Sequence, residues 1–485
     1  MQSDLAIVLG LIGGVFAALV LCGPRAAFAP LIALVLLLLF GVLEVAELGR
    51  LFVGGAVFTI AMMFVLSAAL ERAGCLAALG AVIARLAGRS GAAALALLMG
   101  AALLASAMMN NTPVVIVMTP LAIALGRAMG LAPSRLLIPL SYAAIFGGMT
   151  TLIGASTNIL VSGLAQERGL EPIGMFEMTA PALIMAAAGF AYMMLIGRFL
   201  LPDRSPRPRG PALASHVALR ARLALEATAA AATRVLASSS RHALASGAPA
   251  GEGVADHAPP ERAGVLESAM RLGARAPEAL TEAQPRDASP GKAALAIAVI
   301  ALVMGLAALG VAPIAWLAGL GALIVVLGGG LTLGQAARAI DWSVIGLIIG
   351  MIGLSIAFEK AGGAALAVEA LTTWGDGLSP AAMLLLLFLA TSALTELVSN
   401  SAAALLATPV ALALAAHLGV DPKPFLFAVM VAASASFATP VGYQTNTLVY
   451  RAGGYRFIDF LRIGLPLNLL FAGMSALLLP IFFPF

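Results

Sequence analysis

The stretch Ser106-Ala-Met-Met-Asn-Asn-Thr-Pro113 interrupts an apolar segment that covers residues 91–126. Inside a continuous helix Pro113 would remove a backbone hydrogen bond and clash with an earlier carbonyl, whereas proline suits the first turn of a new helix. The stretch therefore predicts a re-entrant hairpin, in which one helix goes in, turns at the asparagines, and a second helix comes back out. Thr395-Glu-Leu-Val-Ser-Asn-Ser-Ala402 interrupts the segment 379–416 and predicts a second hairpin.

The composition indicates what surrounds these hairpins. Hydrophobic residues make up 61% of the 485 residues, charged residues make up 10%, and the mean hydropathy is +1.04. A soluble domain is typically about 25% charged, so a chain this apolar could not keep its surface in water. Lipid is therefore the expected solvent for most of the chain, and the predicted fold class is an all-α polytopic membrane protein.

Ten further apolar runs are long enough to cross the roughly 30 Å hydrocarbon layer of a bilayer. They lie near residues 5–22, 29–48, 52–70, 136–165, 178–200, 292–310, 313–330, 343–358, 424–450 and 463–483. Five of them precede residue 202 and five follow residue 291, so the chain divides into two membrane halves.

The two halves share a sequence pattern at an offset of 288 or 289 residues. The matching pairs are Glu71 to Gly74 with Glu359 to Gly362, Asn111 with Asn400, Thr119-Pro120 with Thr408-Pro409, Thr150 with Thr439, Gly154 with Gly442, and Thr157-Asn158 with Thr445-Asn446. Five spans separate each motif from its copy, and an odd number turns the second copy upside down. We therefore predict a first transmembrane repeat over 1–201 and a second, inverted repeat over 292–485.

A second interruption follows each hairpin, in the spans 136–165 and 424–450. Gly154 to Asn158 and Gly442 to Asn446 place glycine, threonine and asparagine at membrane depth, where such residues are tolerated beside a wet cavity. Helix N-termini at these breaks would offer N–H groups to an anion, and unwound carbonyls would offer oxygens to a cation. Any one of these residues could merely bond helices together, but the duplicated set favours a neutral site for an anion and Na+.

Glu396 is the one acidic residue close to a hairpin tip, and its counterpart in the first copy is Ala107. An acid at this depth is a candidate functional residue. It could be a carboxylate that couples transport to protons, or it could be paired with an arginine or hydrogen-bonded in place.

Residues 202–291 are rich in alanine, arginine, proline, glycine and serine and contain no long apolar run. This composition predicts a linker, with a regulatory module as the alternative. Arginine-rich connections stay in the cytoplasm, so the linker is expected inside and the N-terminus outside. The protein is accordingly expected to be a multi-pass protein of the bacterial inner membrane.

These motifs resemble the divalent anion–sodium symporter family of the ion transporter superfamily, in its sulfate-permease-like or citrate-transporter-like branch. The resemblance rests on the tips Asn110-Asn111-Thr112 and Ser399-Asn400-Ser401, the two glycine-to-asparagine loops, and the stretch Val441 to Pro466. It implies a permease for a small anion such as sulfate or a di- or tricarboxylate, with Na+ as the coupling ion and no other cofactor. It also suggests a homodimer, and no nucleic-acid partner is expected.

Site residues follow from the same resemblance, position by position. It implies that the anion contacts Asn111, Thr112, Asn400 and Ser401, and that Thr157, Asn158, Thr445 and Asn446 support the loops. It implies one sodium site at Ser106, Asn110, Asn111 and the Gly154 carbonyl, and another at Thr395, the Val398 carbonyl, Asn400 and the Gly442 carbonyl.

Departures from the family pattern leave the substrate open. The first tip has Asn110 where the family has serine, and the second has Ser401 where it has threonine. A proton-coupled antiporter or a metalloid-oxyanion exporter of the same superfamily is the alternative, and Glu396 is the feature that would favour it. An intramembrane enzyme is a remote alternative, because His417 is the only histidine outside the linker and no His-Glu-x-x-His motif is present.

Overall fold

The computed structural model describes residues 2–22, 28–47, 55–74, 90–204, 290–374 and 377–485, with a few isolated positions between them. Most of the predicted linker, 202–291, therefore lies outside the described residues. The described residues form helices and no β-strand, as predicted. Seven of these helices are long and apolar enough to cross a membrane, and shorter apolar helices accompany them.

The described helices divide between the two halves of the chain. The first half contains α1 (Gln2–Cys22), α2 (Ala29–Leu39), α4 (Gly55–Arg72), α6 (Gly91–Met108), α7 (Asn111–Ala128), α8 (Leu137–Gly148), α9 (Ser156–Glu167), α10 (Thr179–Tyr192) and α11 (Arg198–Leu200). The second half contains α15 (Pro290–Ala308), α16 (Ile314–Leu327), α17 (Leu333–Ala339), α18 (Trp342–Lys360), α19 (Gly363–Trp374), α20 (Pro380–Thr395), α21 (Asn400–Leu418), α22 (Lys423–Ser434), α23 (Gln444–Ala452) and α24 (Phe457–Phe482).

Both predicted kinds of interruption are present in the helix boundaries. The first hairpin turns between α6 and α7, and the second turns between α20 and α21. Residues 149–155 separate α8 from α9, and residues 435–443 separate α22 from α23. One predicted span is shorter than expected: α2 ends at Leu39 because the chain turns there, with Gly41 at a φ of 70°.

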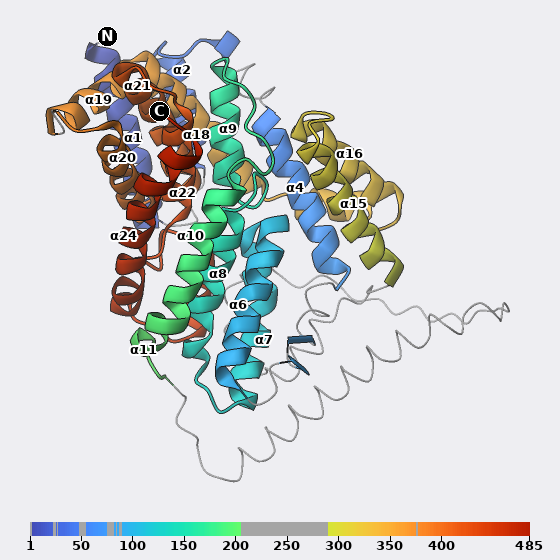
Figure 1. Ribbon diagram of the computed structural model, residues 1–485. Helices are drawn as coiled ribbons and strands as arrows, with labels where there is room; N and C mark the ends of the chain where they lie inside the picture. The colour runs from blue at the N-terminus through green and yellow to red at the C-terminus, as the bar shows by residue number, and fades with distance from the viewer. Residues whose placement is uncertain are drawn as a thin grey trace.

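Two pairs of helix contacts correspond between the halves. Helix α6 packs on α8 as α20 packs on α22, and α7 packs on α23 as α21 packs on α9. Figure 1 draws the α6–α7 hairpin in the lower half of the molecule and α20–α21 in the upper half. Hairpins that enter from opposite ends are what inverted copies would produce, and the inversion itself stays a prediction.

Helices α8 and α22 form the centre of the molecule. Every residue of α8 is buried, as is every residue of α22 after Lys423. An aromatic cluster joins the two halves beside them: the ring of Phe437 lies 5.0 Å from Tyr142, 5.5 Å from Phe146 and 5.3 Å from Phe471, between centroids. This rigid core holds the two loops that interrupt the central helices.

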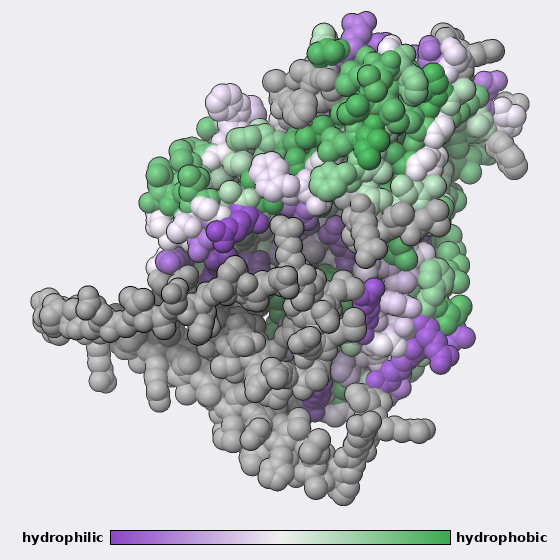
Figure 2. All heavy atoms as spheres, turned by 180° about the vertical axis from the view of Figure 1, so that it is seen from behind, coloured by the Kyte–Doolittle hydropathy of each residue, from purple (hydrophilic) through white to green (hydrophobic). Residues whose placement is uncertain are grey.

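Much of the outer surface is apolar. Large side chains such as Leu39, Trp316 and Leu327 are about three-quarters exposed, at 74%, 75% and 77%. Figure 2 shows a broad hydrophobic face over the upper part of the molecule, with hydrophilic side chains below it. An apolar surface of this extent fits lipid rather than water as its neighbour.

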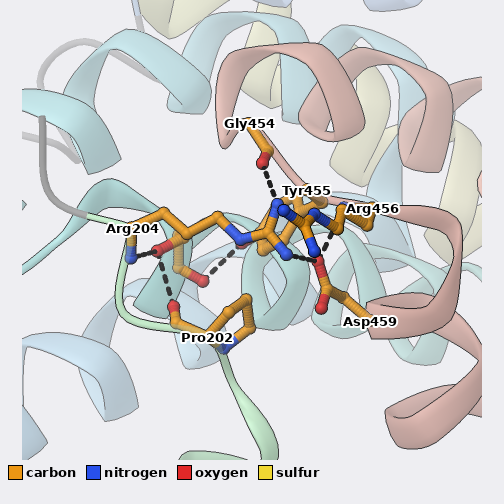
Figure 3. Close-up of polar contacts among 7 residues, drawn as sticks. Pro202, Arg204, Gly454, Tyr455, Arg456 and Asp459 are labelled. Carbon is orange, nitrogen blue, oxygen red and sulfur yellow. Dashed lines mark hydrogen bonds and ion pairs between the residues drawn. The ribbon is translucent and has the colours of Figure 1, made fainter.

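Arg204, at the start of the predicted linker, is hydrogen-bonded to residues of the second half (Figure 3). The Arg204 guanidinium donates to the Gly454 carbonyl and to Asp459 Oδ2, each at 2.6 Å, and the Arg204 backbone N–H donates to Ser134 Oγ at 3.1 Å. Asp459 also accepts from the Arg456 backbone N–H at 2.6 Å. These charge-assisted bonds tie the end of the first half to the α23–α24 turn. In Figure 1 this end of the molecule lies opposite both chain termini.

Candidate functional site

The first hairpin tip is built around Asn111, which is fully buried. Its Oδ1 accepts a hydrogen bond from Ser106 Oγ, and its Nδ2 donates to Tyr443 Oη at 2.6 Å. Helix α6 has ended before this point, so the tip is free to turn and Asn111 begins α7. The neighbouring Asn110 lines a narrow cleft on the α4 side of the tip, together with Met63 and Ser156. Asn110 and Asn111 therefore have different neighbours.

The second tip repeats the hydroxyl–asparagine pair. Thr395 Oγ1 donates to Asn400 Oδ1 at 3.0 Å, and Thr395 also lies 2.8 Å from the Ala433 carbonyl oxygen. The Ser399 hydroxyl caps the N-terminus of α21 by accepting from the Ala402 N–H at 3.4 Å. Val398, the predicted carbonyl ligand, is buried just before this cap. The structure therefore gathers the predicted second-site residues at one turn.

Each loop after a central helix is braced by its own asparagine. Asn158 Nδ2 donates to the carbonyls of Gly148 and Thr151 at 3.1 and 2.9 Å. Asn446 Nδ2 donates to the carbonyls of Ser436 and Thr439 at 2.7 and 3.1 Å. Both asparagines are fully buried. These bonds fit the predicted role of the two asparagines as supports for the loops, which stays a prediction.

These bonds correct one detail of the repeat. The sequence comparison pairs Thr439 with Thr150, but the structure pairs it with Thr151. Thr151 Oγ1 donates to the Ala107 carbonyl at 2.6 Å and accepts from the Gly154 N–H at 3.1 Å. Thr439 Oγ1 donates to the Glu396 carbonyl and accepts from the Gly442 N–H, both at 3.1 Å. Thr150 instead bonds the Gly147 carbonyl at 2.7 Å, because the loop register, not residue identity, decides which hydroxyl reaches the tip.

Close packing presses each loop glycine against a tip carbonyl. A Cβ on Gly154 would lie 2.9 Å from the Ser106 carbonyl oxygen, and one on Gly442 would lie 2.6 Å from the Thr395 carbonyl oxygen. Real Cβ atoms do not come this close, so both positions require glycine. Each loop thus lies directly beside the serine or threonine at its tip.

Contacts between the halves bring helix N-termini together in pairs. At the start of α7, Thr112 Oγ1 donates to Gln444 Oε1 of α23 at 3.2 Å. At the start of α21, Ser401 Oγ lies 3.5 Å from Ser156 Oγ of α9. Free backbone N–H groups and the positive ends of helix dipoles therefore converge beside both tips, which favours an anion there.

Further hydroxyl contacts fix the loops to the central helices. Thr157 Oγ1 lies 2.6 Å from Ser434 Oγ. Ser141 Oγ lies 2.9 Å from Thr445 Oγ1 and donates to Asn446 Oδ1 at 2.8 Å. The predicted supporting residues therefore contact the opposite half as well as their own loop.

Glu396 is hydrogen-bonded in place by four donors. Its Oε1 accepts from the Ala438 N–H and from Asn468 Nδ2, both at 2.8 Å. Its Oε2 accepts from the Thr439 N–H at 2.8 Å and from Ser436 Oγ at 3.2 Å. The carboxylate thereby holds the loop 435–443, and this geometry favours the alternative in which it is fixed by hydrogen bonds. The first copy has Ala107 at this position, and its loop is held by the Thr179 hydroxyl instead, which donates to the Thr150 carbonyl at 2.5 Å.

Several site residues escaped the sequence analysis, chiefly Tyr443, Gln444, Ser141, Ser434 and Asn468. Tyr443 and Gln444 stand inside a stretch that carries the family resemblance, yet their reach to Asn111 and Thr112 spans 332 residues of sequence. The sequence signal that could have identified Tyr443 and Gln444 is their size, because the first loop has the small residues Ala155 and Ser156 at the matching positions.

Comparison with known protein families shows to which family the chain belongs. A family model described as "Citrate transporter" matches residues 16–432 and 397–485. The chain belongs to the citrate transporter family. The protein is therefore a membrane transporter and not an enzyme, and the resemblance seen in its motifs is confirmed.

Individual relatives agree with this assignment. An uncharacterized transporter of Synechocystis is 30% identical, with 92% of this chain and 91% of that protein covered. The uncharacterized transporter YfbS of Escherichia coli is 26% identical, covering 94% of this chain and 95% of YfbS. A protein of Chlamydomonas reinhardtii named sodium/sulfate cotransporter 1 is 36% identical over 144 residues, which are 30% of this chain and 16% of that protein.

A solved structure supports the fold alone. MtrF of Neisseria gonorrhoeae, described among antimetabolite efflux pumps, aligns with a TM-score of 0.52 and 14% identity. The alignment covers 89% of this chain and 82% of MtrF.

Proposed function

We propose that this member of the citrate transporter family is a secondary transporter that moves a small anion, such as sulfate or a di- or tricarboxylate, together with Na+. The observation that carries the proposal is the duplicated unit of tip and loop. In each copy a hydroxyl bonds an asparagine oxygen beside a glycine loop, at Ser106–Asn111 and at Thr395–Asn400. The relatives named sodium/sulfate cotransporters support the same choice of substrate and ion.

Two sodium sites are proposed where the tip residues meet the loops. Side-chain oxygens of Ser106, Asn110 and Asn111, with the Gly154 carbonyl, would form the first. Thr395 and Asn400, with the carbonyls of Val398 and Gly442, would form the second. Neutral oxygens of this kind suit a hard cation, and a bound Na+ would offset the charge of an anion held by the neighbouring N–H groups.

The anion is proposed to lie beside Asn111, Thr112, Asn400 and Ser401. The N-terminus of α7 meets that of α23, and the N-terminus of α21 meets that of α9. Asparagine amides and hydroxyls donate to an anion without burying a charge of their own. A proton-coupled antiporter remains the second candidate, and Glu396 is the observation that would favour it.

Ligand-dependent stability tests the coupling between the two ligands. We expect sulfate or a carboxylate to raise the melting temperature of purified protein strongly in NaCl and little in choline chloride, because the cation completes the anion site. An anion at 100 times its dissociation constant stabilises a folded protein by about 2.7 kcal/mol. Equal stabilisation in both salts would argue against sodium coupling, and chloride serves as the control anion.

We further propose that residues 202–291 are cytoplasmic and that both termini lie outside. The structure supports this orientation, because α11 (Arg198–Leu200), which precedes residue 202, lies at the end of the molecule away from the termini (Figure 1). With Cys22 and Cys75 replaced by alanine, Glu171→Cys and Ala230→Cys should react with an impermeant reagent from opposite sides of the membrane. Labelling of both from the same side would overturn the inverted orientation of the repeats.

A further inference from the structure

The two ends of the proposed anion site differ in what the loops present to the hairpin tips. At an offset of 288, Tyr443 and Gln444 of the second loop correspond to Ala155 and Ser156 of the first. The large pair therefore faces one tip, and the small pair faces the other. The first loop is braced by the Thr179 hydroxyl and the second by Glu396, and these two side-chain pairs are a further difference between the copies.

At the first tip both predicted anion ligands already have protein partners. Asn111 Nδ2 donates to Tyr443 Oη at 2.6 Å, and Thr112 Oγ1 donates to Gln444 Oε1 at 3.2 Å. The Gln444 oxygen is an acceptor and would repel an anion placed beside it. One of the two N–H groups of Asn111 Nδ2 is therefore already used by the tyrosine.

At the second tip one hydrogen-bond donor has no partner among the described residues. Asn400 Nδ2 is buried and has no hydrogen-bond partner among the described residues, while Asn400 Oδ1 is held by Thr395. Ala155 offers no polar side chain there, and Ser401 Oγ lies at the long distance of 3.5 Å from Ser156 Oγ. A buried donor without a partner is unfavourable, so a ligand acceptor at this position would be favoured.

We propose that the transported anion is compact, with a single oxyanion group held at the second tip, and that Tyr443 with Gln444 closes the first tip to longer anions. This inference rests on the proposed function and narrows its substrate class to tetrahedral oxyanions. A tetrahedral oxyanion presents acceptors in several directions around one centre and needs only the Asn400 side. A di- or tricarboxylate needs donors for two separated carboxylates, and the second of these would meet the Tyr443 ring.

Uptake of labelled sulfate and labelled succinate into proteoliposomes with an inward Na+ gradient tests the inference. The unmodified protein should prefer sulfate over succinate by about tenfold or more, since a pocket rejects a ligand whose polar groups find no partner. The double variant Tyr443→Ala, Gln444→Ser copies the first loop, and it should raise the succinate-to-sulfate ratio by about tenfold. Tyr450→Ala on α23 is the control and should leave the ratio unchanged.

If the double variant does not fold, the succinate-to-sulfate uptake ratio of the single variant Gln444→Ser tests the same inference. Gln444 is exposed at the start of α23, and the single change should move the ratio in the same direction. Comparable sodium-driven uptake of sulfate and succinate by the unmodified protein would overturn the inference and leave the proposed function standing. So would an unchanged ratio in a folded double variant. Sodium-independent uptake, or none for any anion, would overturn the proposed function itself.

Discussion

Asn111→Ala and Asn400→Ala should each abolish transport while leaving the fold largely intact. Each asparagine sits at a turn where a hydroxyl bonds its Oδ1 and helix ends converge, so its amide can face both an anion and a cation. Truncation removes an acceptor oxygen and a donor N–H together. Each unsatisfied partner costs about 1–3 kcal/mol, or roughly one to two decades of affinity. Uptake by reconstituted protein and its melting temperature are the two measurements.

The two variants should differ in which ligand they lose. Asn400 carries the unpartnered donor, so its truncation should weaken anion binding most. Asn111 holds Ser106 and Tyr443, so its truncation should weaken sodium binding most. Higher Na+ should partly rescue Ser106→Ala, which loses one of several ligands, but should not rescue Asn400→Ala, which loses the donor to the anion.

Ser475→Ala is the matched control, because Ser475 is a buried polar residue on α24 whose hydroxyl contacts only the Met185 sulfur, at 3.5 Å, among the hydrogen bonds described. It should keep both stability and transport near the unmodified level. Normal transport by both asparagine variants would mean that these residues merely bond helices together, and the whole site assignment would fail.

Glu396→Gln should lower both the melting temperature and transport, at every pH at which uptake is measured. The carboxylate accepts from the backbone N–H groups of Ala438 and Thr439. An amide replaces one acceptor oxygen by a donor, so at least one of these N–H groups is left without an acceptor. That loss costs about 1–3 kcal/mol, and it falls on the loop that carries Gly442. The side chain of Asn468 can turn to present its oxygen, but a backbone N–H cannot turn.

Glu369→Gln on α19 is the control for charge removal, because Glu369 is exposed and far from the tips in sequence. If Glu396 instead carries a proton, Glu396→Gln will keep its melting temperature and lose the pH dependence of transport. That result would favour the proton-coupled alternative over the sodium symporter.

The sequence predicted the hairpins and broken helices because particular residues forbid the alternatives. Pro113 lies in the first turn of α7, where proline is favoured, and Gly154 and Gly442 leave no room for a side chain against the tip carbonyls. The duplicated Asn158 and Asn446 were predicted as supports of the loops, and each proves to bond two carbonyls of its own loop. Local stereochemistry and repetition were sufficient for these features.

Contacts between the halves could not be predicted in the same way. Tyr443 meets Asn111 across 332 residues, and only the packed helices determine that distance. The pairing of Thr439 with Thr151 depends on the path of each loop, since two adjacent threonines are equally good matches in sequence. The Arg204–Asp459 bond could not be predicted from the sequence either, because the arginine-rich composition around Arg204 predicts a linker and no partner.

Sodium-driven accumulation is the measurement that tests the central claim most directly. Proteoliposomes containing the purified protein receive labelled sulfate outside, with Na+ outside and K+ inside, and a parallel set receives equal Na+ on both sides. We expect accumulation above the external concentration only with the inward Na+ gradient, and its loss in Asn111→Ala and Asn400→Ala. Accumulation driven by a pH gradient without Na+, at the same rate in both asparagine variants, would contradict it.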